Sequence, residues 1–349
     1  METKRINLAL QGGGAHGAFT WGVLEVFLDQ PWLEIAAISG TSAGALNGAA
    51  LKAGLVRGGA RHGRQAARED LEWLWSQVDE VVDLRLSRWV NALFPHPEVI
   101  NRWLELVSPT AMMDQMGRLF SPYDYGPFYS NPLARVVERF EYEHVCARKG
   151  PAFFVSATNV RTGKIRVFEG EEISTEAILA SACLPNMFQA VEIDDPKTGR
   201  REAYWDGGFT GNPALFPLYD AKLPRDIVIV NINPLERDGV PRSPGEIEDR
   251  INEISFNASL LCDLRAINFV RRLLAQHRVP AGEMKDVLIH MVADDKVMTD
   301  LGAQSKLMPG LGTLQRLRKA GQAAAERFLG AHGAKIGQEA SVDLASLFG

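Results

Sequence analysis

The sequence predicts an α/β fold in which a mostly parallel central sheet is covered by helices on both faces. Two stretches near the N-terminus support this prediction. Residues Ile6–Leu10 form an apolar run that is followed by a glycine-rich loop and by an apolar helical stretch, Ala18–Leu28. A second apolar run, which ends at Gly40, is followed at once by small, helix-compatible residues. Strand, loop, helix, strand, turn and helix in this order is typical of parallel sheets.

The composition is that of a globular protein with a substantial core. The chain has 349 residues, of which 46% are hydrophobic and 23% are charged. Its formal net charge of −5 favours no nucleic-acid partner. No apolar run is long enough for a signal-peptide core or a membrane span, so we expect a cytosolic protein. The three cysteines show no metal-like spacing and predict free thiols in a reducing compartment: Cys146, Cys183 and Cys262.

The strand pattern disappears beyond residue 53 and returns only at about residue 150. We therefore expect residues 53–150 to form an insertion of helices and loops. It would serve as a lid or acyl-chain pocket, or it would be ordinary helical packing over the sheet.

The remaining elements follow from β-branched runs, turn residues and helix caps. Strands are predicted at Ala152–Ala157, Lys164–Phe168, Gln189–Ile193, Arg201–Tyr204, Asp226–Ile232 and Val287–Val292. Helices are predicted at Thr175–Leu184, Ile247–His277 and Leu311–Leu329. Residues Asp194–Arg200 have the turn chemistry of a hairpin, and Pro185 ends the helix before it. The C-terminal tail shows little pattern.

A serine stands at the second strand-to-helix junction. Residues Gly40–Gly44 match Gly-x-Ser-x-Gly, the setting in which a nucleophilic serine is pushed out on a strained turn. Gly40 and Gly44 have no side chains to crowd the elbow where strand and helix nearly touch. The helix N-terminus would direct unpaired amides towards the group that Ser42 attacks. The alternative is a glycine-rich turn with an incidental serine.

The first loop, Gly12-x-Gly14-x-x-Gly17, is compatible with two kinds of site. Its spacing matches the dinucleotide fingerprint, but the second strand ends without the acid that binds the ribose, and Glu34 stands at or before its start. The alternative is an oxyanion hole, because consecutive glycines expose N–H groups at a helix N-terminus. Neighbouring strands would bring the amides of Gly12, Gly13 and Gly14 to an acyl group on Ser42.

Two residues are candidates for the base that activates Ser42. The order Ser42, Asp206, His290 fits an α/β-hydrolase triad, but several strands precede the serine in that fold and only two precede it here. His290 also lies inside an apolar strand, where a packed histidine is expected. Asp206 ends a strand before two glycines, and a carboxylate shielded from water can take a serine proton directly. The alternative for Asp206 is an ordinary turn residue.

These motifs, in this order, resemble the patatin-like phospholipase family. The residues that carry the resemblance are Gln11–Gly17, Gly40–Gly44, Ser181–Phe188 and Asp206–Gly208. It covers roughly residues 5–235. The resemblance implies a three-layer α/β/α sandwich with a Ser42–Asp206 dyad, the 12–14 loop as oxyanion hole, no catalytic histidine, no metal and no cofactor. The implied reaction is hydrolysis of lipid acyl esters through an acyl-enzyme.

Two positions depart from the family pattern. The family often has Asp where Gln11 stands and Arg or Lys where His16 stands. The backbone donors survive both changes, but position 16 then offers no fixed cation to a phosphate head group.

We expect one catalytic domain over residues 1–335 and a tail over residues 336–349, with C-terminal helices at 244–330. The long helix combines apolar positions at steps of three and four with several arginines: Arg265, Arg271, Arg272 and Arg278. It would lie on an anionic membrane surface, or it would dock on the core with its arginines in solvent. The basic stretch 52–68 has the same two interpretations.

The sequence thus predicts a cytosolic lipid acyl-ester hydrolase of the phospholipase A or lysophospholipase type, with peripheral membrane contact left open. The alternatives are a catalytically silent lipid-binding or regulatory protein of the same fold and, third, a dinucleotide-binding protein.

Overall fold

The computed structural model describes residues 2–82, 121–124, 129–280, 282–301, 306 and 312–348. Eight strands form one sheet in the order β5-β6-β3-β2-β1-β7-β8, and β4 pairs with β3 outside this path. Their bounds are β1 (Lys4–Leu10), β2 (Leu33–Gly40), β3 (Ala152–Asn159), β4 (Ile165–Glu169), β5 (Val191–Asp195), β6 (Arg200–Asp206), β7 (Asp226–Val230) and β8 (Leu288–Val292). The pairs from β3 through β2, β1 and β7 to β8 are parallel, and β4, β5 and β6 add antiparallel pairs.

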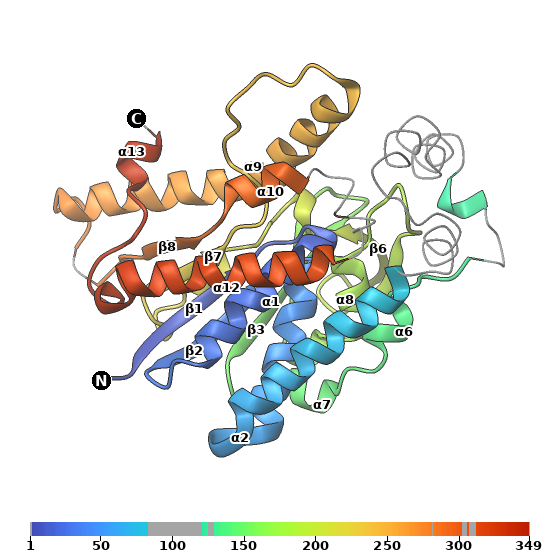
Figure 1. Ribbon diagram of the computed structural model, residues 1–349, viewed down its shortest axis with the longest axis horizontal. Helices are drawn as coiled ribbons and strands as arrows, with labels where there is room; N and C mark the ends of the chain where they lie inside the picture. The colour runs from blue at the N-terminus through green and yellow to red at the C-terminus, as the bar shows by residue number, and fades with distance from the viewer. Residues whose placement is uncertain are drawn as a thin grey trace.

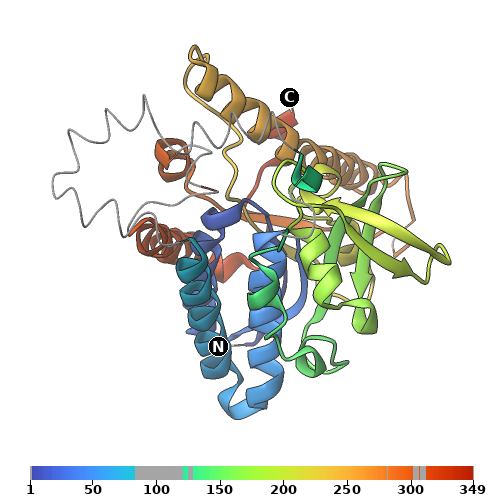
Figure 2. The ribbon, with the colours of Figure 1, turned by 90° about the vertical axis from the view of Figure 1, so that its right-hand side faces the viewer.

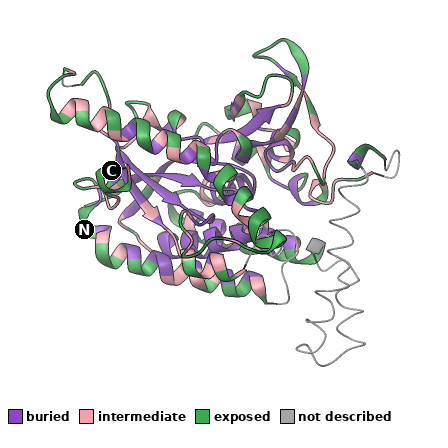
Figure 3. Ribbon diagram, turned by 90° about the horizontal axis from the view of Figure 1, so that it is seen from above, coloured by how far each residue is buried: buried purple, intermediate pink, exposed green. Residues whose placement is uncertain are grey.

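Helices cover both faces of the sheet, which confirms the predicted three-layer α/β/α sandwich (Figures 1 and 2). One face carries α1 (Gly17–Leu28), α2 (Ala43–Val82) and α12 (Thr313–His332). The other carries α9 (Pro244–Ala275) and α13 (Leu344–Phe348). Shorter helices are α6 (Ala134–Val137), α7 (Tyr142–Val145), α8 (Thr175–Ser181) and α10 (Asp295–Leu301). In Figure 3 the central strands are mainly buried, whereas the helices have exposed outer sides.

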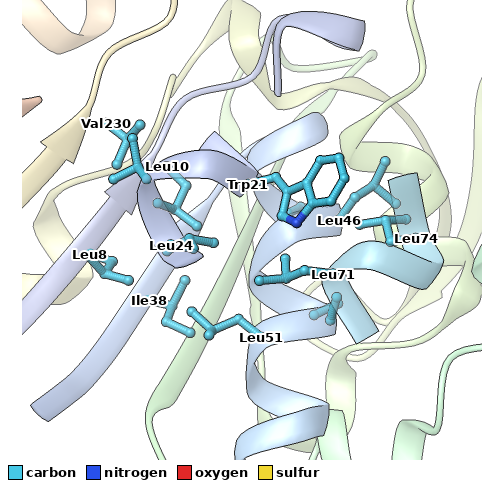
Figure 4. Close-up of a cluster of buried hydrophobic side chains, with 14 of the residues drawn as sticks. Leu8, Leu10, Trp21, Leu24, Ile38, Leu46, Leu51, Leu71, Leu74 and Val230 are labelled. Atoms are coloured by element: carbon cyan, nitrogen blue, oxygen red, sulfur yellow. The ribbon is translucent and has the colours of Figure 1, made fainter. Parts of the chain in front are cut away.

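The alternation of side chains along the central strands separates two cores. Leu8 and Leu10 of β1 belong to the cluster under α1, α2 and α12, and Figure 4 shows them near Leu24 and Ile38. Ala9, between them, belongs to the cluster under α9. Because successive strand residues point to opposite faces, an uninterrupted apolar strand serves both cores.

Helices α1 and α12 approach each other closely enough that only glycine fits between them. A Cβ on Gly22 of α1 would meet the backbone carbonyl of Arg318, and a Cβ on Gly321 of α12 would meet that of Phe19. The backbone of α12, the helix predicted at Leu311–Leu329, is therefore in direct contact with the backbone of α1.

Helix α2 is broken at Gly59, where φ is 57° and ψ is −156°. Its two halves run back along each other, because a Cβ on Gly54 would meet the backbone of Ala67. The predicted insertion at 53–150 therefore begins inside a helical hairpin that packs on the sheet. Residues 83–120, which make up much of the predicted insertion, lie outside the described residues.

The arginines of the basic stretch 52–68 are largely used within the fold. Arg64 donates to the carbonyls of Phe27, Leu28 and Leu33, and Arg57 pairs with Asp70 and Glu141. Arg68 pairs with Asp29 and donates to the Glu25 carbonyl. These contacts favour the structural interpretation of this stretch over the membrane one.

The apolar stripe of α9 is also used by the fold. Leu260, Leu264 and Ile267 are buried against the sheet, so this part of the helix is docked on the core. The tail, which shows little pattern in the sequence, contains α13, and Leu344 of α13 is buried in the same cluster. Among the helices that the structure describes, none combines the length and apolar character needed to cross a bilayer.

Strands β2 and β6 meet end to end along the same side of β3, and this places the candidate site. Strand β4 pairs with residues 154–158 of β3. On the other side of β3, β2 pairs with residues 152–155 in parallel and β6 pairs with residues 157–159 in the antiparallel direction. The carboxyl ends of β2 and β6 therefore point towards each other.

Candidate active site

Ser42 lies on a strained turn between β2 and α2. Its φ is +53°, a conformation rare for residues other than glycine. A Cβ on Gly40 would come within 2.6 Å of the Gly44 carbonyl oxygen, and a Cβ on Gly44 would meet the Leu10 carbonyl. Both glycines are therefore required by close backbone contacts, as predicted for a serine elbow. The Ser42 N–H donates to Ser181 Oγ at 2.9 Å.

The glycine loop after β1 contacts this elbow directly. A Cβ on Gly12 would lie 2.6 Å from Ser42 Cβ and 2.9 Å from the Thr41 carbonyl oxygen. Strands β1 and β2 are parallel neighbours, so the loops that follow them emerge at the same edge. The structure thus brings together the two glycine-rich turns, whose first glycines, Gly12 and Gly40, are 28 residues apart in the sequence.

Asp206, the last residue of β6, lies on the other side of the elbow. It is fully buried, and its N–H donates to the Cys183 carbonyl at 2.8 Å. Its Oδ1 atom accepts a hydrogen bond from Gly208 N–H at 2.7 Å. A Cβ on Gly207 would lie 3.0 Å from the Thr41 side chain, so the β6 turn packs against the elbow turn.

The Asp206 carboxyl has a pKa well above that of an ordinary aspartate. Burial raises its pKa to about 7, while hydrogen bonds from Gly208 and from the Ser42 side chain oppose this rise. In the described part of the chain, its Oδ2 atom has no partner that meets full hydrogen-bond geometry. The carboxyl therefore stands beside the Ser42 hydroxyl, and its Oδ2 atom takes no part in the hydrogen bond from Gly208.

One of the three predicted amide donors is already used. Gly12 N–H donates to Asn212 Oδ1 at 2.6 Å, and Asn212 Nδ2 donates back to the Gly12 carbonyl at 3.3 Å. Within the described ranges, the amides of Gly13 and Gly14 have no hydrogen-bond acceptor. Of the three predicted donors, Gly12 is thus the one whose amide is bonded within the described part of the protein.

Gln11 is the centre of a buried polar network beneath the loop. Its Oε1 atom accepts from the backbone amides of Ile232 and Asn233, at 2.9 and 3.1 Å. Its Nε2 atom donates to the Asn212 carbonyl and to Asn257 Oδ1 of α9. An aspartate could not donate these two bonds, which gives the departure from the family pattern at this position a structural reason.

A cation lies near the loop although position 16 has none. His16 is buried. Its burial and, to a smaller extent, the nearby charge of Lys306 lower the pKa of its ring to about 3, so the ring is neutral at pH 7. Burial also lowers the pKa of Lys306 to about 8, and its Nζ donates to Asn233 Oδ1 at 2.7 Å. The residues that sequence reasoning left out are Lys306, Asn212 and Ser181. Lys306 has no sequence signal, whereas Ser181 opens a segment that carries the resemblance and Asn212 lies within the range 5–235 that the resemblance covers.

His290 lies apart from this site, as the packed-histidine interpretation predicts. It is fully buried in β8, and β7 and β1 separate that strand from β2. Its Nε2 atom is 2.9 Å from Asp226 Oδ1. The three cysteines are unpaired, and the described residues include no group of three or more histidine, cysteine or acidic side chains that could hold a metal ion.

The fold and these contacts define an α/β protein in which a strained serine, a buried carboxyl and a glycine loop meet at one sheet edge. The model of the family described as patatin-like phospholipase matches residues 8–220. The chain therefore belongs to the patatin-like phospholipase family. Membership in this family supports lipid acyl hydrolase activity in general terms.

No curated protein matches the chain. Among solved structures, a similar one is the crystal structure of VipD from Legionella pneumophila. It is 15% identical, the match covers 95% of this chain and 67% of the VipD chain, and the TM-score is 0.38.

Proposed function

We propose that this protein hydrolyses acyl esters of lipids through an acyl-enzyme formed on Ser42, with Asp206 as general base. The observation that carries the proposal is the strained turn of Ser42 beside the fully buried carboxyl of Asp206, whose pKa burial raises to about 7. A carboxyl with a pKa near the working pH is a better proton acceptor than an ordinary aspartate. The family match over residues 8–220 supports lipid esters as the substrate class.

The proposed reaction has two steps. Ser42 Oγ attacks the ester carbonyl while its proton passes to Asp206, and the proton then leaves with the alcohol. Water next gives a proton to Asp206 and attacks the acyl-enzyme, and the fatty acid is released as the proton returns to Ser42. The amides of Gly13 and Gly14 would stabilise the oxyanion of each tetrahedral intermediate, because the Gly12 amide is bound to Asn212.

The phospholipase A or lysophospholipase type is the finer part of this proposal. Lys306 supports it, because its ammonium lies near the glycine loop where His16 provides no charge. This cation would attract the phosphate of a head group in place of the basic residue at position 16.

A dinucleotide site is disfavoured by the space around the loop. Cβ atoms on Gly12, Gly13 and Gly14 would each meet other protein atoms, from Ser42, Ile232 and Lys306 respectively. The glycines are thus required by packing within the protein, and β2 ends in Ser39-Gly40 without an acid.

The test is hydrolysis of a soluble short-chain ester and of a panel of phospholipids, lysophospholipids and neutral lipids by the purified chain. We expect turnover that disappears in Ser42→Ala. A folded wild type that hydrolyses none of these esters but binds lipid would support the catalytically silent alternative and contradict the proposal.

A further inference from the structure

The C-terminal end of α8 contacts both candidate catalytic residues. Ser181, the last residue of this helix, accepts a hydrogen bond at its Oγ atom from the Ser42 N–H at 2.9 Å. Two residues further on, the Cys183 carbonyl accepts from the Asp206 N–H at 2.8 Å. One short segment, residues 181–183, therefore binds the backbone of the nucleophile and the backbone of the base. We call residues 181–183 the bridging segment.

The bridging segment is held by contacts of its own on both sides. The helix before it packs on β3, β5 and β6 (Figure 1), and its residues Ala177, Ile178 and Ala180 are fully buried. The Cys183 N–H donates to the Ala180 carbonyl at 3.2 Å, which continues the last turn of the helix. The Cys183 thiol donates to the Gln189 carbonyl at 3.1 Å. The core thus fixes the place of the two acceptors that Ser42 and Asp206 use.

The Ser42 amide lies at the strained turn and is shielded from water. Ser42 is 7% exposed, and Ser181 is fully buried. A buried amide that loses its acceptor is costly, because no water replaces the lost hydrogen bond. A residue with a φ of +53° also keeps this conformation only where its surroundings enforce it. The hydroxyl of Ser181 is therefore one of the contacts that make the strained conformation of Ser42 favourable.

We propose that Ser181 is a positioning residue: its hydroxyl holds the backbone of Ser42 in the strained conformation and, through the bridging segment, at a fixed separation from Asp206. This inference rests on the proposed function, since it concerns the geometry of the same reacting pair. Ser181 acts through Ser42 and takes no proton in the reaction. A displacement of about 1 Å costs up to about a hundredfold in rate. Loss of this hydrogen bond therefore lowers kcat and leaves substrate binding nearly unchanged.

The other end of α8 offers a matched control. Ser174 is the N-cap of this helix, and its Oγ atom accepts from the Ala177 N–H at 3.3 Å. Ser181→Ala and Ser174→Ala thus each remove one hydrogen bond between a serine of this region and a backbone amide. Both should lower the midpoint of denaturant unfolding. Only Ser181→Ala should lower kcat on a soluble short-chain ester, by about ten- to a hundredfold, with KM changed less than about threefold.

A second substitution at the same position gives a graded result. Ser181→Cys keeps a weak acceptor in nearly the same place. Its kcat should lie between those of the wild type and Ser181→Ala, and it takes the place of Ser181→Ala if that variant does not fold. A kcat of Ser181→Cys below that of a folded Ser181→Ala would contradict the role of the acceptor.

Amide hydrogen exchange at residue 42 tests the same contact without any turnover. It is measured by mass spectrometry of overlapping peptides. We expect exchange at this amide to be about tenfold faster in Ser181→Ala than in the wild type or in Ser174→Ala.

Four results would overturn the inference. They are a wild-type kcat in folded Ser181→Ala, unchanged exchange at residue 42, equal losses of kcat in Ser181→Ala and Ser174→Ala, and a loss that appears only as a raised KM. Equal losses would follow from a weakened helix, and a raised KM would mean that Ser181 contacts the substrate. A wild type that hydrolyses no ester, with the expected difference in exchange, would contradict the proposed function alone.

Discussion

Ser42 is held at a φ of +53°, and Asp206 is buried with one carboxyl oxygen left without a full hydrogen bond. Each of these states costs stability, of the order of 1–3 kcal/mol for such a backbone conformation. Residues kept in unfavourable states by their surroundings are characteristic of active sites. The contact between the two therefore supports a role in chemistry better than either feature alone.

The role of Asp206 as base is tested by Asp206→Asn with His290→Gln as the control. We expect Asp206→Asn to lower kcat on a soluble ester by about 10²- to 10⁴-fold, because the amide cannot accept the serine proton. His290→Gln should leave kcat nearly unchanged, since His290 pairs with Asp226 away from the site. Equal losses in two folded variants, measured by steady-state kinetics, would point to a triad.

The pH profile follows from the raised pKa of Asp206. The carboxyl must be ionised to accept a proton, so kcat/KM should rise about tenfold per pH unit at low pH and level off above about pH 7. The profile is measured on a soluble ester from about pH 3.5 to about 9, so that it spans the pKa of an unperturbed aspartate. A plateau that already begins near pH 4, the range of an unperturbed aspartate, would show that burial does not set this pKa.

At the residue scale, the sequence was most informative where backbone geometry demands glycine. Gly40, Gly44 and Gly12 all stand at positions where a Cβ would clash, and each belongs to a predicted motif. The partners that arrive from distant segments could not be predicted in this way. Lys306 has no motif of its own, and the use of the Gly12 amide by Asn212 depends on the meeting of segments 200 residues apart.

At the element scale, the end-to-end arrangement of β2 and β6 along β3 decides which residues meet. The sequence predicts both strands, but their register on β3 is set by long-range pairing that the local pattern does not contain. For the same reason the sequence predicts the helix that becomes α12 without indicating that this helix packs on α1. The sequence also does not indicate that α2 breaks at Gly59 in particular, because several glycines stand close together in this stretch and any of them could interrupt a helix.

The contact between α1 and α12 is tested by Gly321→Ala, with Gly330→Ala on the same helix as the control. A methyl group at position 321 would meet the Phe19 carbonyl, whereas position 330 opens into free space. We expect Gly321→Ala to lower the free energy of unfolding by about 1–3 kcal/mol. Gly330→Ala should raise it by about 0.5–1 kcal/mol, because alanine favours the helix. Denaturant titration measures both, and similar effects would contradict this packing.

At the scale of the whole molecule, the three-layer sandwich was predictable because its central strands are apolar on both faces and alternate with helices. The single-domain boundaries and the role of the insertion stay predictions, since residues 83–120 lie outside the described residues. Amphipathic spacing alone could not decide whether the arginine-rich stripe of α9 docks on the core or lies on a membrane. The structure buries the apolar residues of that stripe in the core.

The burial of Asp206 should also appear in the stability of the whole fold. The folded state retains a proton that the unfolded chain loses, so stability falls as the pH rises from about 4 to about 7. Asp206→Asn removes this loss, which amounts to about 1.4 kcal/mol per unit of pKa shift. We therefore expect the variant to be more stable than the wild type at pH 8 and to differ less at pH 4, by chemical denaturation. A variant that is less stable at pH 8 would contradict the account.

The central claim, that Ser42 is an activated nucleophile, is tested most directly by a fluorophosphonate probe followed by mass spectrometry of the labelled peptide. The account predicts one covalent adduct on Ser42, absent in Ser42→Ala and formed far more slowly in Asp206→Asn. An unlabelled wild type, or an adduct on another serine that persists in Ser42→Ala, would contradict it.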